Sequence, residues 1–195
     1  MDFHLIAYNS ELYDAWNNVF AECPAVTISL GDILTFKADA IVSPANSFGY
    51  MDGGLDLKYS QFFGWDLEKR LRKLLLEKHY GELPVGQAVI VETEHPAIQY
   101  LISAPTMRVP MNVAETVNAY LAFRAIIQAT KAFNQTERAP ITSILCPGLA
   151  TGEGQMPAER CAFQMYEAYR SCVIGEVETK GGLAGAVRGQ MELLK

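Results

Sequence analysis

The chain contains little of what characterises secreted, metal-binding or membrane-spanning proteins. Its four cysteines (Cys23, Cys146, Cys161 and Cys172) include no CxxC pair and have no neighbouring histidines, so the sequence predicts neither a zinc site nor a disulfide framework. No apolar run approaches the roughly 20 residues that cross a bilayer, and the N-terminus lacks a basic segment followed by an apolar stretch. We therefore expect a soluble, cytoplasmic protein with reduced thiols, no membrane association and no metal.

The chain also lacks an excess of positive charge. Its 16 Lys and Arg residues are outnumbered by 22 Asp and Glu residues, and the net charge of −6 argues against sequence-independent binding to nucleic-acid backbone. Basic residues over 69–78 alternate with leucines, which predicts an amphipathic helix with a solvated basic face. We find no internal repeat and no HExxH, GxSxG or P-loop motif. Strong nucleic-acid binding is not expected.

What the chain does contain is an alternation of strand and helix patterns. Half of its 195 residues are apolar, enough to bury one substantial core, and an α/β domain of this length usually stays single. Strands are predicted over residues 3–7, 26–30, 40–42, 87–92, 100–103 and 141–146, and helices over 10–21, 55–78, 113–133 and 157–171. Because runs such as 88–91 are apolar on both faces, we expect a mixed sheet between helices, with ligands bound beyond the carboxyl ends of its strands.

One segment, residues 31–64, has the pattern of a ligand-binding loop mounted on a buried strand. Residues 40–42 form a short apolar run that suits a central strand, and Pro44 ends it because proline cannot donate to a sheet ladder. Beyond it, Asn46 and several glycines can adopt positive φ or let a ligand approach the main chain, and Asp56 opens the next predicted helix. This arrangement suits a ligand that contains phosphate.

Two Gly-containing stretches carry a family resemblance. They read ADAIVSPANSFGYMDGGLDLKYSQFFG over residues 38–64 and CPGLATGEGQMP over residues 146–157. In this order they resemble the signature and the second phosphate loop of the macro domain family, the ADP-ribose-binding fold, and the first stretch is similar to its MacroD-type ADP-ribosyl hydrolases. The resemblance covers residues 26–169 in outline, but only the two loops are specific.

The resemblance implies a three-layer α/β/α fold with a central, mixed, mostly parallel sheet. We expect one macro domain over residues 1–195, with its recognisable core at 26–171. The tail at 175–195 is the part about which the sequence says least. Within it, the Gly-rich stretch 180–189 is interpreted as a loose connection to a short final element.

The resemblance also implies roles for residues of the two loops. Asp32 would accept a hydrogen bond from the exocyclic amine of adenine, with the main chain of Ile33 beside it, although an Asp after a strand is also a common helix cap. Asn46 would contact the hydroxyls of the distal ribose, since an amide both donates and accepts, although Asn also forms turns. The phosphates would lie against the main chain and helix ends at Gly53, Gly54, Leu55, Thr151, Gly152, Glu153, Gly154 and Gln155.

Asp56 is the residue on which the expectation of catalysis depends. In MacroD-type hydrolases, an Asp ten residues after the ribose-binding Asn orients or deprotonates water for attack at the anomeric carbon of the distal ribose. Asp56 follows Asn46 by ten residues here. A carboxylate suits this step, because water must lose a proton while positive charge builds on the sugar. The resemblance therefore implies Asp56 and Asn46 as catalytic residues, although Asp56 is also placed to cap its helix.

The first loop departs from the family pattern. Where MacroD-type proteins usually have four consecutive glycines, this chain has Met51-Asp52-Gly53-Gly54, which predicts a stiffer loop with an added carboxylate. Asp52 either faces solvent or takes part in altered chemistry, and it would repel a diphosphate if it pointed inward. Glu153 and Gln155 likewise make the second loop more polar than is usual. We expect phosphate binding to survive these changes and leave substrate choice open.

The sequence leads to one main hypothesis and two alternatives. The main hypothesis is an ADP-ribosyl hydrolase that cleaves a glycosidic or ester bond at the distal ribose, needs no cofactor, and releases ADP-ribose from a modified protein or small molecule. The alternatives are a non-catalytic reader of ADP-ribose and a phosphatase of ADP-ribose 1″-phosphate. A Schiff-base route through Lys58 is disfavoured, because its placement does not match the lysine-dependent branch of the superfamily.

Overall fold

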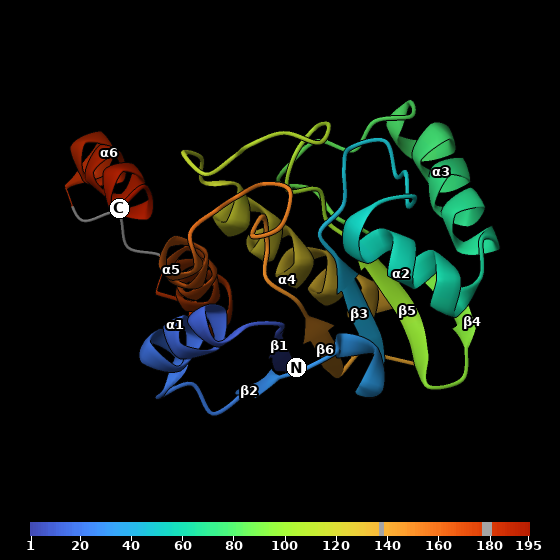
Figure 1. Ribbon diagram of the computed structural model, residues 1–195. Coiled ribbons are helices and arrows are strands. Elements are labelled where there is room, and N and C mark those ends of the chain that lie inside the picture. Colours follow the sequence, from blue (N-terminus) through green and yellow to red (C-terminus); the bar gives the residue numbers. More distant parts are fainter. Residues whose placement is uncertain (137–138, 177–180) are drawn as a thin grey trace.

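A six-stranded sheet runs through the middle of the molecule in the order β2-β1-β6-β3-β5-β4 (Figure 1). The computed structural model describes residues 1–136, 139–176 and 181–195. The strands are β1 (Asp2–Ala7), β2 (Val26–Leu30), β3 (Ala40–Ser43), β4 (Val89–His95), β5 (Ile98–Ser103) and β6 (Ser143–Cys146). All neighbours are parallel except β4 and β5, so the sheet is mixed and mostly parallel, as predicted.

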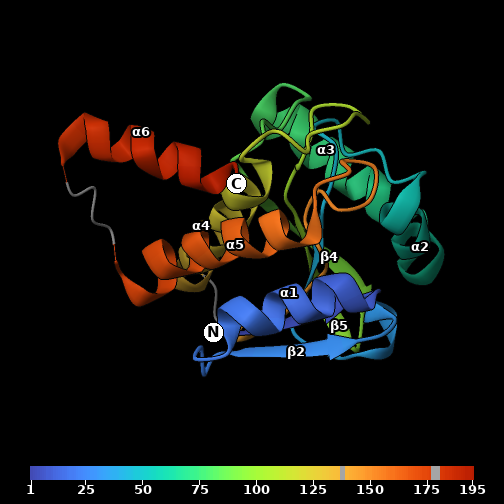
Figure 2. The same ribbon diagram turned by 60° about the vertical axis from the view of Figure 1, so that its left-hand side comes forward.

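Helices cover both faces of the sheet (Figures 1 and 2). One face carries α1 (Ser10–Phe20), α4 (Asn118–Thr136) and α5 (Ala158–Tyr169), and the other carries α2 (Gly54–Phe63) and α3 (Asp66–His79). A further helix, α6 (Gly182–Leu193), lies outside these layers and buries none of its residues. None of the helices in the three described ranges is long and apolar enough to cross a membrane. The three-layer α/β/α arrangement is therefore confirmed.

The central strands are apolar on both faces because each face packs against helices. In β3, Ala40 and Val42 belong to the core shared with α1, α4 and α5, whereas Ile41 between them packs with the leucines of α3. All four residues of β3 are fully buried. Such a strand has no solvent-facing side, which explains why its sequence shows no polar alternation.

The pairing of β3 with β6 at the centre of the sheet is reinforced by Asp39, directly before β3. One carboxylate oxygen of Asp39 accepts four hydrogen bonds, from the main-chain N–H and the hydroxyl of Thr142 and of Ser143, at 2.7–3.0 Å. Partial burial works against the charged form, yet these hydrogen bonds lower the pKa of Asp39 below its ordinary value. Asp39 thus sets the starts of both strands side by side, and their carboxyl ends with them.

Most predicted elements are present, and the deviations have local causes. The strand predicted at 26–30 has those bounds, but the helix predicted from residue 113 begins only at Asn118. The earlier start is wrong because the N–H of Val113 donates to the carbonyl of Gly154 (2.9 Å), which ties this stretch to the second loop. The helix predicted to residue 171 ends at Tyr169 and continues as the π-helix η2 (Arg170–Ile174).

The tail contains the final element that the sequence predicts, and it is the helix α6. The Gly-rich connection predicted at 180–189 begins at residue 180, which lies outside the described residues, and from Gly182 onward it is helical. The buried Gln164 of α5 donates to the carbonyl of Leu193 (2.8 Å), so α6 is attached to the body near its C-terminal end.

Replacing Asp39 tests the connection between β3 and β6. We expect Asp39→Ala to lower the free energy of unfolding at pH 7 by about 1–3 kcal/mol, since it removes the acceptor of four hydrogen bonds. Because the pKa of Asp39 is lowered by folding, its contribution is present above about pH 4 and is lost as the pH falls through the lowered pKa. Urea denaturation of wild type and variant at pH 7 and pH 3 measures this. Asp14→Ala, on the exposed side of α1, is the control. Equal free energies of unfolding at pH 7 for wild type, Asp39→Ala and Asp14→Ala would contradict the role of Asp39.

Candidate functional site

A cleft of about 720 Å³ opens beyond the carboxyl ends of the central strands, a volume within the usual range for small-molecule sites. Its walls are the loop from β3 to α2, the loop from β6 to α5, and the segments that follow β1, β2 and β5. In Figure 1 these loops gather above the sheet. Of the residues predicted for the site, it is lined by Asp32, Ile33, Asn46, Gly53, Gly54, Leu55, Asp56, Thr151, Gly152, Glu153 and Gly154.

The first loop, residues 44–53, is shaped by the side chain of Asn46. Its Oδ1 accepts hydrogen bonds from the N–H groups of Phe48 (3.0 Å) and Tyr50 (3.3 Å), and its Nδ2 donates to the carbonyl of Tyr50 (2.8 Å). Both lone pairs of Oδ1 are therefore occupied within the loop, and one N–H of the amide is left for a ligand. The sequence predicted that this amide both donates hydrogen bonds to a ribose and accepts them from it. With Oδ1 occupied, the prediction that remains is donation by the free N–H.

Met51 anchors the first loop where the family pattern has glycine. Its side chain is fully buried, its N–H donates to Glu68 (2.8 Å), and its carbonyl accepts from Ser60 (2.8 Å). The guanidinium of Arg72 stacks on the ring of Tyr50, 4.2 Å from its centroid. These contacts hold the loop against α2 and α3. Asp52, in contrast, is exposed at the edge of the cleft.

Asp56 lies in the first turn of α2, with only 8% of its surface exposed, and it lines the cleft. Its Oδ1 accepts a hydrogen bond from the hydroxyl of Ser43 at 2.6 Å. Burial, with a smaller contribution from the charge of Glu68, raises the pKa of Asp56 to about 7, although the hydrogen bond from Ser43 acts to lower it. A carboxyl group that titrates near neutrality at the wall of a cleft is suited to proton transfer.

The second loop, residues 147–157, depends on two glycines that no larger residue could replace without a shift. A Cβ on Gly154 would lie 2.5 Å from the carbonyl oxygen of Ala150, and one on Gly148 would lie 2.5 Å from the hydroxyl of Thr151. Gly152, by contrast, has open space where a side chain would be. Gln155 does not line the cleft: its Oε1 accepts a hydrogen bond from Asn112 (3.1 Å).

Both loops carry unpaired main-chain N–H groups on residues that line the cleft. Within the described part of the chain, the N–H groups of residues 53–56 and of residues 151–154 donate no hydrogen bond. The first set forms the N-terminus of α2, where the helix dipole adds partial positive charge. Unpaired N–H groups at a helix N-terminus and in a glycine-containing loop are donors that can bind phosphate through the main chain.

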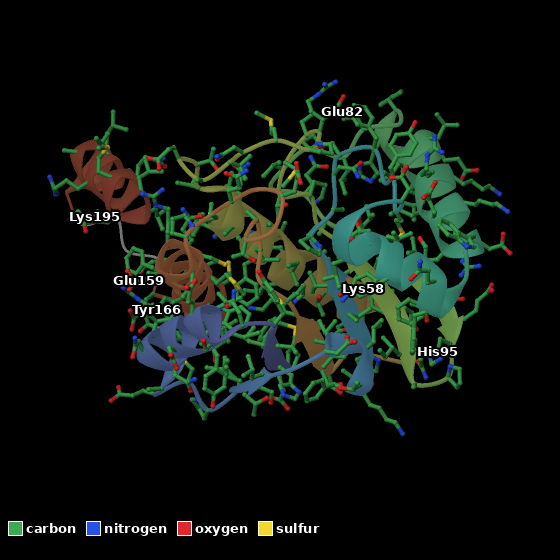
Figure 3. The ribbon with its side chains drawn as sticks, viewed as in Figure 1. Lys58, Glu82, His95, Glu159, Tyr166 and Lys195 are labelled. Carbon is green, nitrogen blue, oxygen red and sulfur yellow. The ribbon has the colours of Figure 1, made fainter. Side chains whose placement is uncertain are left out.

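The charged side chains of the cleft are mostly acidic. Four carboxylates line it, from Asp32, Asp52, Asp56 and Glu153, and Lys58 of α2 is the one cation among its described lining residues (Figure 3). An anionic ligand would therefore be held mainly by N–H groups and by Lys58. No group of three His, Cys, Asp or Glu side chains in the described ranges is arranged to hold a metal ion.

Asp32 forms the helix cap that the sequence suggested as one of its two roles. Its Oδ1 caps the short helix η1 (Ile33–Thr35) by accepting from the N–H of Leu34 (3.1 Å). The residue is exposed and lines the cleft, so its second oxygen is open to a ligand. The helix cap is thus a feature of the structure, and adenine binding stays a prediction.

Sequence reasoning missed several residues of the site. Tyr8 follows β1, and Thr106 and Pro110 follow β5, at the same edge of the sheet as the two loops. Applying the carboxyl-end rule to every parallel strand would have found them. Ser43, the hydrogen-bond partner of Asp56, was not singled out in the sequence, although a polar residue directly after a buried apolar run was an available signal.

Comparisons with known proteins find one matching family model and several relatives. The family model described as Macro domain matches residues 42–165. An uncharacterized protein of Aquifex aeolicus is 30% identical over 145 residues, which cover 74% of this chain and 81% of that protein. An uncharacterized protein of Aeropyrum pernix is 30% identical over 138 residues, 70% of this chain and 66% of that protein.

Solved structures show the same fold. The macrodomain of Mycobacterium tuberculosis DarG superposes with a TM-score of 0.60 at 20% identity, over 72% of this chain and 87% of that one. A variant of the Oceanobacillus iheyensis macrodomain, with ADP-ribose, superposes with a TM-score of 0.57 at 18% identity, over 75% of this chain and 90% of that one. Thermosipho africanus DarTG, in complex with ADP-ribose, superposes with a TM-score of 0.58 at 18% identity, over 71% of this chain and 37% of that one.

The burial of Asp56 predicts a pH-dependent stability. Between pH 3.8, the pKa of an exposed Asp, and about pH 7, the folded protein keeps a proton that the unfolded chain has lost. The contribution of Asp56 to the free energy of unfolding should therefore be most favourable below pH 3.8. It should fall as the pH rises from 3.8 to about 7, and stay at its lowest value above pH 7. Asp56→Asn keeps the shape without the charge, so we expect it to be more stable than wild type at pH 8, by an amount on the order of 2–4 kcal/mol.

Urea denaturation of Asp56→Asn and wild type at pH 4, 6 and 8 measures the difference. Asp52→Asn, on the exposed neighbouring position, is the control and should follow the wild type at each pH. Stability curves for Asp56→Asn that stay parallel to those of the wild type from pH 4 to 8 would contradict a raised pKa.

Proposed function

This chain belongs to the macro domain family, and we propose that it binds ADP-ribose in the cleft and hydrolyses a bond at the distal ribose. The observation that carries the proposal is the nearly buried carboxyl group of Asp56, which lies directly beside the unpaired N–H groups that begin α2. A site that binds phosphate and holds a base next to it is suited to chemistry on a phosphorylated sugar.

Each part of the cleft suits one part of ADP-ribose. The open oxygen of Asp32 would accept from the adenine amine. The diphosphate would lie between residues 53–56 and 151–154, whose unpaired N–H groups could bind an anion without cationic side chains. Asn46 would donate its remaining N–H to a hydroxyl of the distal ribose.

In the proposed reaction, water attacks the anomeric carbon of the distal ribose. The bond from that carbon to the leaving group breaks with its electron pair, a bond to the water oxygen forms, and Asp56 takes the proton that the water loses. The pKa of Asp56, raised to about 7, makes it a base that accepts a proton readily near neutral pH. Modified proteins or small molecules that carry ADP-ribose are the substrate class.

The acidic edge of the cleft and the burial of Asp56 each disfavour one of the two alternatives. A phosphatase of ADP-ribose 1″-phosphate would have to bring a further dianion toward Asp52 and Glu153, which disfavours it. A non-catalytic reader would need no base, whereas Asp56 is kept nearly buried despite the unfavourable free energy of burying its charge. The retained carboxyl group favours the hydrolase.

Calorimetric titration with ADP-ribose tests the binding part of the proposal. We expect wild type to bind, Asp32→Ala to lose about 10-fold or more in affinity with the loss of the adenine contact, and Lys58→Gln to lose about 5-fold with the loss of the cation in the cleft. Lys73→Gln makes the same charge change on the exposed side of α3 and should bind like wild type. No heat of binding by folded wild type, or equal affinities for all four proteins, would contradict the assignment of the cleft.

Release of ADP-ribose from an ADP-ribosylated protein tests the hydrolase part. Asp56→Asn should lower kcat by about 10²- to 10⁴-fold, because the variant has no base, while its affinity for ADP-ribose stays within a few-fold of wild type. Asp52→Asn is the matched control on the adjacent loop and should retain turnover. Binding without turnover by wild type would identify the protein as a reader.

A further inference from the structure

Two buried serines lie side by side beneath α2. Ser43 ends β3 and Ser103 ends β5, and the two residues are register partners in this parallel pair. Side chains alternate along a strand, and both Ile41 and Leu101, two residues earlier, belong to the core on the α2 and α3 side. Ser43 and Ser103 therefore point to that same face, where Asp56 of α2 lies.

The two hydroxyls differ in their partners. Ser43 is fully buried and donates its proton to Oδ1 of Asp56 at 2.6 Å, a length typical of a hydroxyl bound to a carboxylate. Ser103 is 1% exposed, and in the described structure its hydroxyl has no hydrogen-bond partner. A buried hydroxyl without a partner is unfavourable by about 1–3 kcal/mol, so its presence beside Ser43, the serine that binds Asp56, needs an explanation.

The protonation of Asp56 supplies that reason. When Asp56 is ionised, it can only accept, and Ser43 donates to it across the 2.6 Å contact. When Asp56 is protonated and donates to Ser43 instead, the hydroxyl proton of Ser43 must turn to another acceptor. Ser103, its register partner on the neighbouring strand, has a hydroxyl oxygen without a partner and is the acceptor that we assign to it.

We propose that Ser43 and Ser103 form a positioning relay that holds the carboxyl group of Asp56 in one place in both its ionised and its protonated state. The inference deepens the proposed hydrolase function and rests on it for the role of Asp56. A base changes its protonation state in each catalytic cycle, and the relay lets it do so without moving from the attacking water. Both serines are positioning residues, since neither lines the cleft.

Other titratable groups face Asp56 and also influence its protonation. Glu68 of α3 raises the pKa of Asp56, and Tyr59 of α2 is itself buried with a pKa well above its ordinary value. Asp52 and Lys58 share the cleft wall with it. None of these groups needs to change in the serine variants, so a change in the titration of Asp56 between those variants reports on the relay.

The relay predicts opposite effects for the two serines. Ser43→Ala removes the donor to the ionised form and should raise the pKa of Asp56, whereas Ser103→Ala removes the acceptor needed only by the protonated form and should lower it. Carboxyl ¹³C NMR of wild type and each variant, titrated from pH 4 to 9, measures both. Thr130→Val, which removes a buried hydroxyl in α4 that donates to its own helix, is the control and should titrate like wild type.

Kinetics with an ADP-ribosylated protein provide the second readout. We expect Ser43→Ala to lower kcat about 10- to 100-fold with the affinity for ADP-ribose nearly unchanged, and Ser43→Thr, which restores the hydroxyl, to recover most of the activity. The pH at which kcat is half-maximal should move up for Ser43→Ala and down for Ser103→Ala, as the NMR titrations do.

The outcomes separate the relay from the proposed function. If the wild type binds ADP-ribose but does not hydrolyse the substrate, the hydrolase proposal fails, and the relay is still judged by the NMR titrations. If Ser103→Ala leaves the pKa of Asp56 unchanged, or shifts it in the same direction as Ser43→Ala, the relay is overturned. If Ser43→Ala keeps wild-type kcat and pH profile, Ser43 has no positioning role.

Discussion

The parallel pairing of β3 with β6 is the constraint on which the rest of the site depends. Because their carboxyl ends lie at the same edge of the sheet, the loops that follow them face one another across a single cleft. Asp39 reinforces this pairing at the opposite ends of the two strands, through four hydrogen bonds to Thr142 and Ser143. A shift of one residue in this register would turn Ser43 to the opposite face of the sheet, away from Asp56.

The cleft is proposed to bind a diphosphate, although most of its charged side chains are acidic. Its lining carries more carboxylates than cations, and the positive potential comes from main-chain N–H groups and the N-terminus of α2. Such dipoles keep their orientation when the ligand arrives, so little reorganisation is needed. They also leave Asp56 without a salt-bridge partner among the described residues, which lets burial raise its pKa to about 7.

The added side chains of the first loop act in two different ways. Met51 replaces a flexible glycine with a buried anchor, fixed further by the hydrogen bonds of its main chain to Glu68 and Ser60. Asp52 remains exposed at the edge of the cleft. The loop is therefore held by hydrogen bonds to α2 and α3 before any ligand binds, which lowers the loss of conformational entropy that binding would have to offset. Asn46 takes part in this preorganisation through both of its amide atoms.

The sequence by itself determined the layers, the bounds of strands such as β2, and the two loops, because apolar periodicity and glycine patterns act over short stretches of chain. It did not determine the start of α4, where Val113 bonds to Gly154, or the position of Gln155, which pairs with Asn112 outside the cleft. The hydrogen bond from Ser43 to Asp56, the free Ser103 hydroxyl beside it and the raised pKa of Asp56 were likewise decided only by tertiary structure. Each of these depends on contacts between residues distant along the chain, and on burial, which local pattern cannot specify.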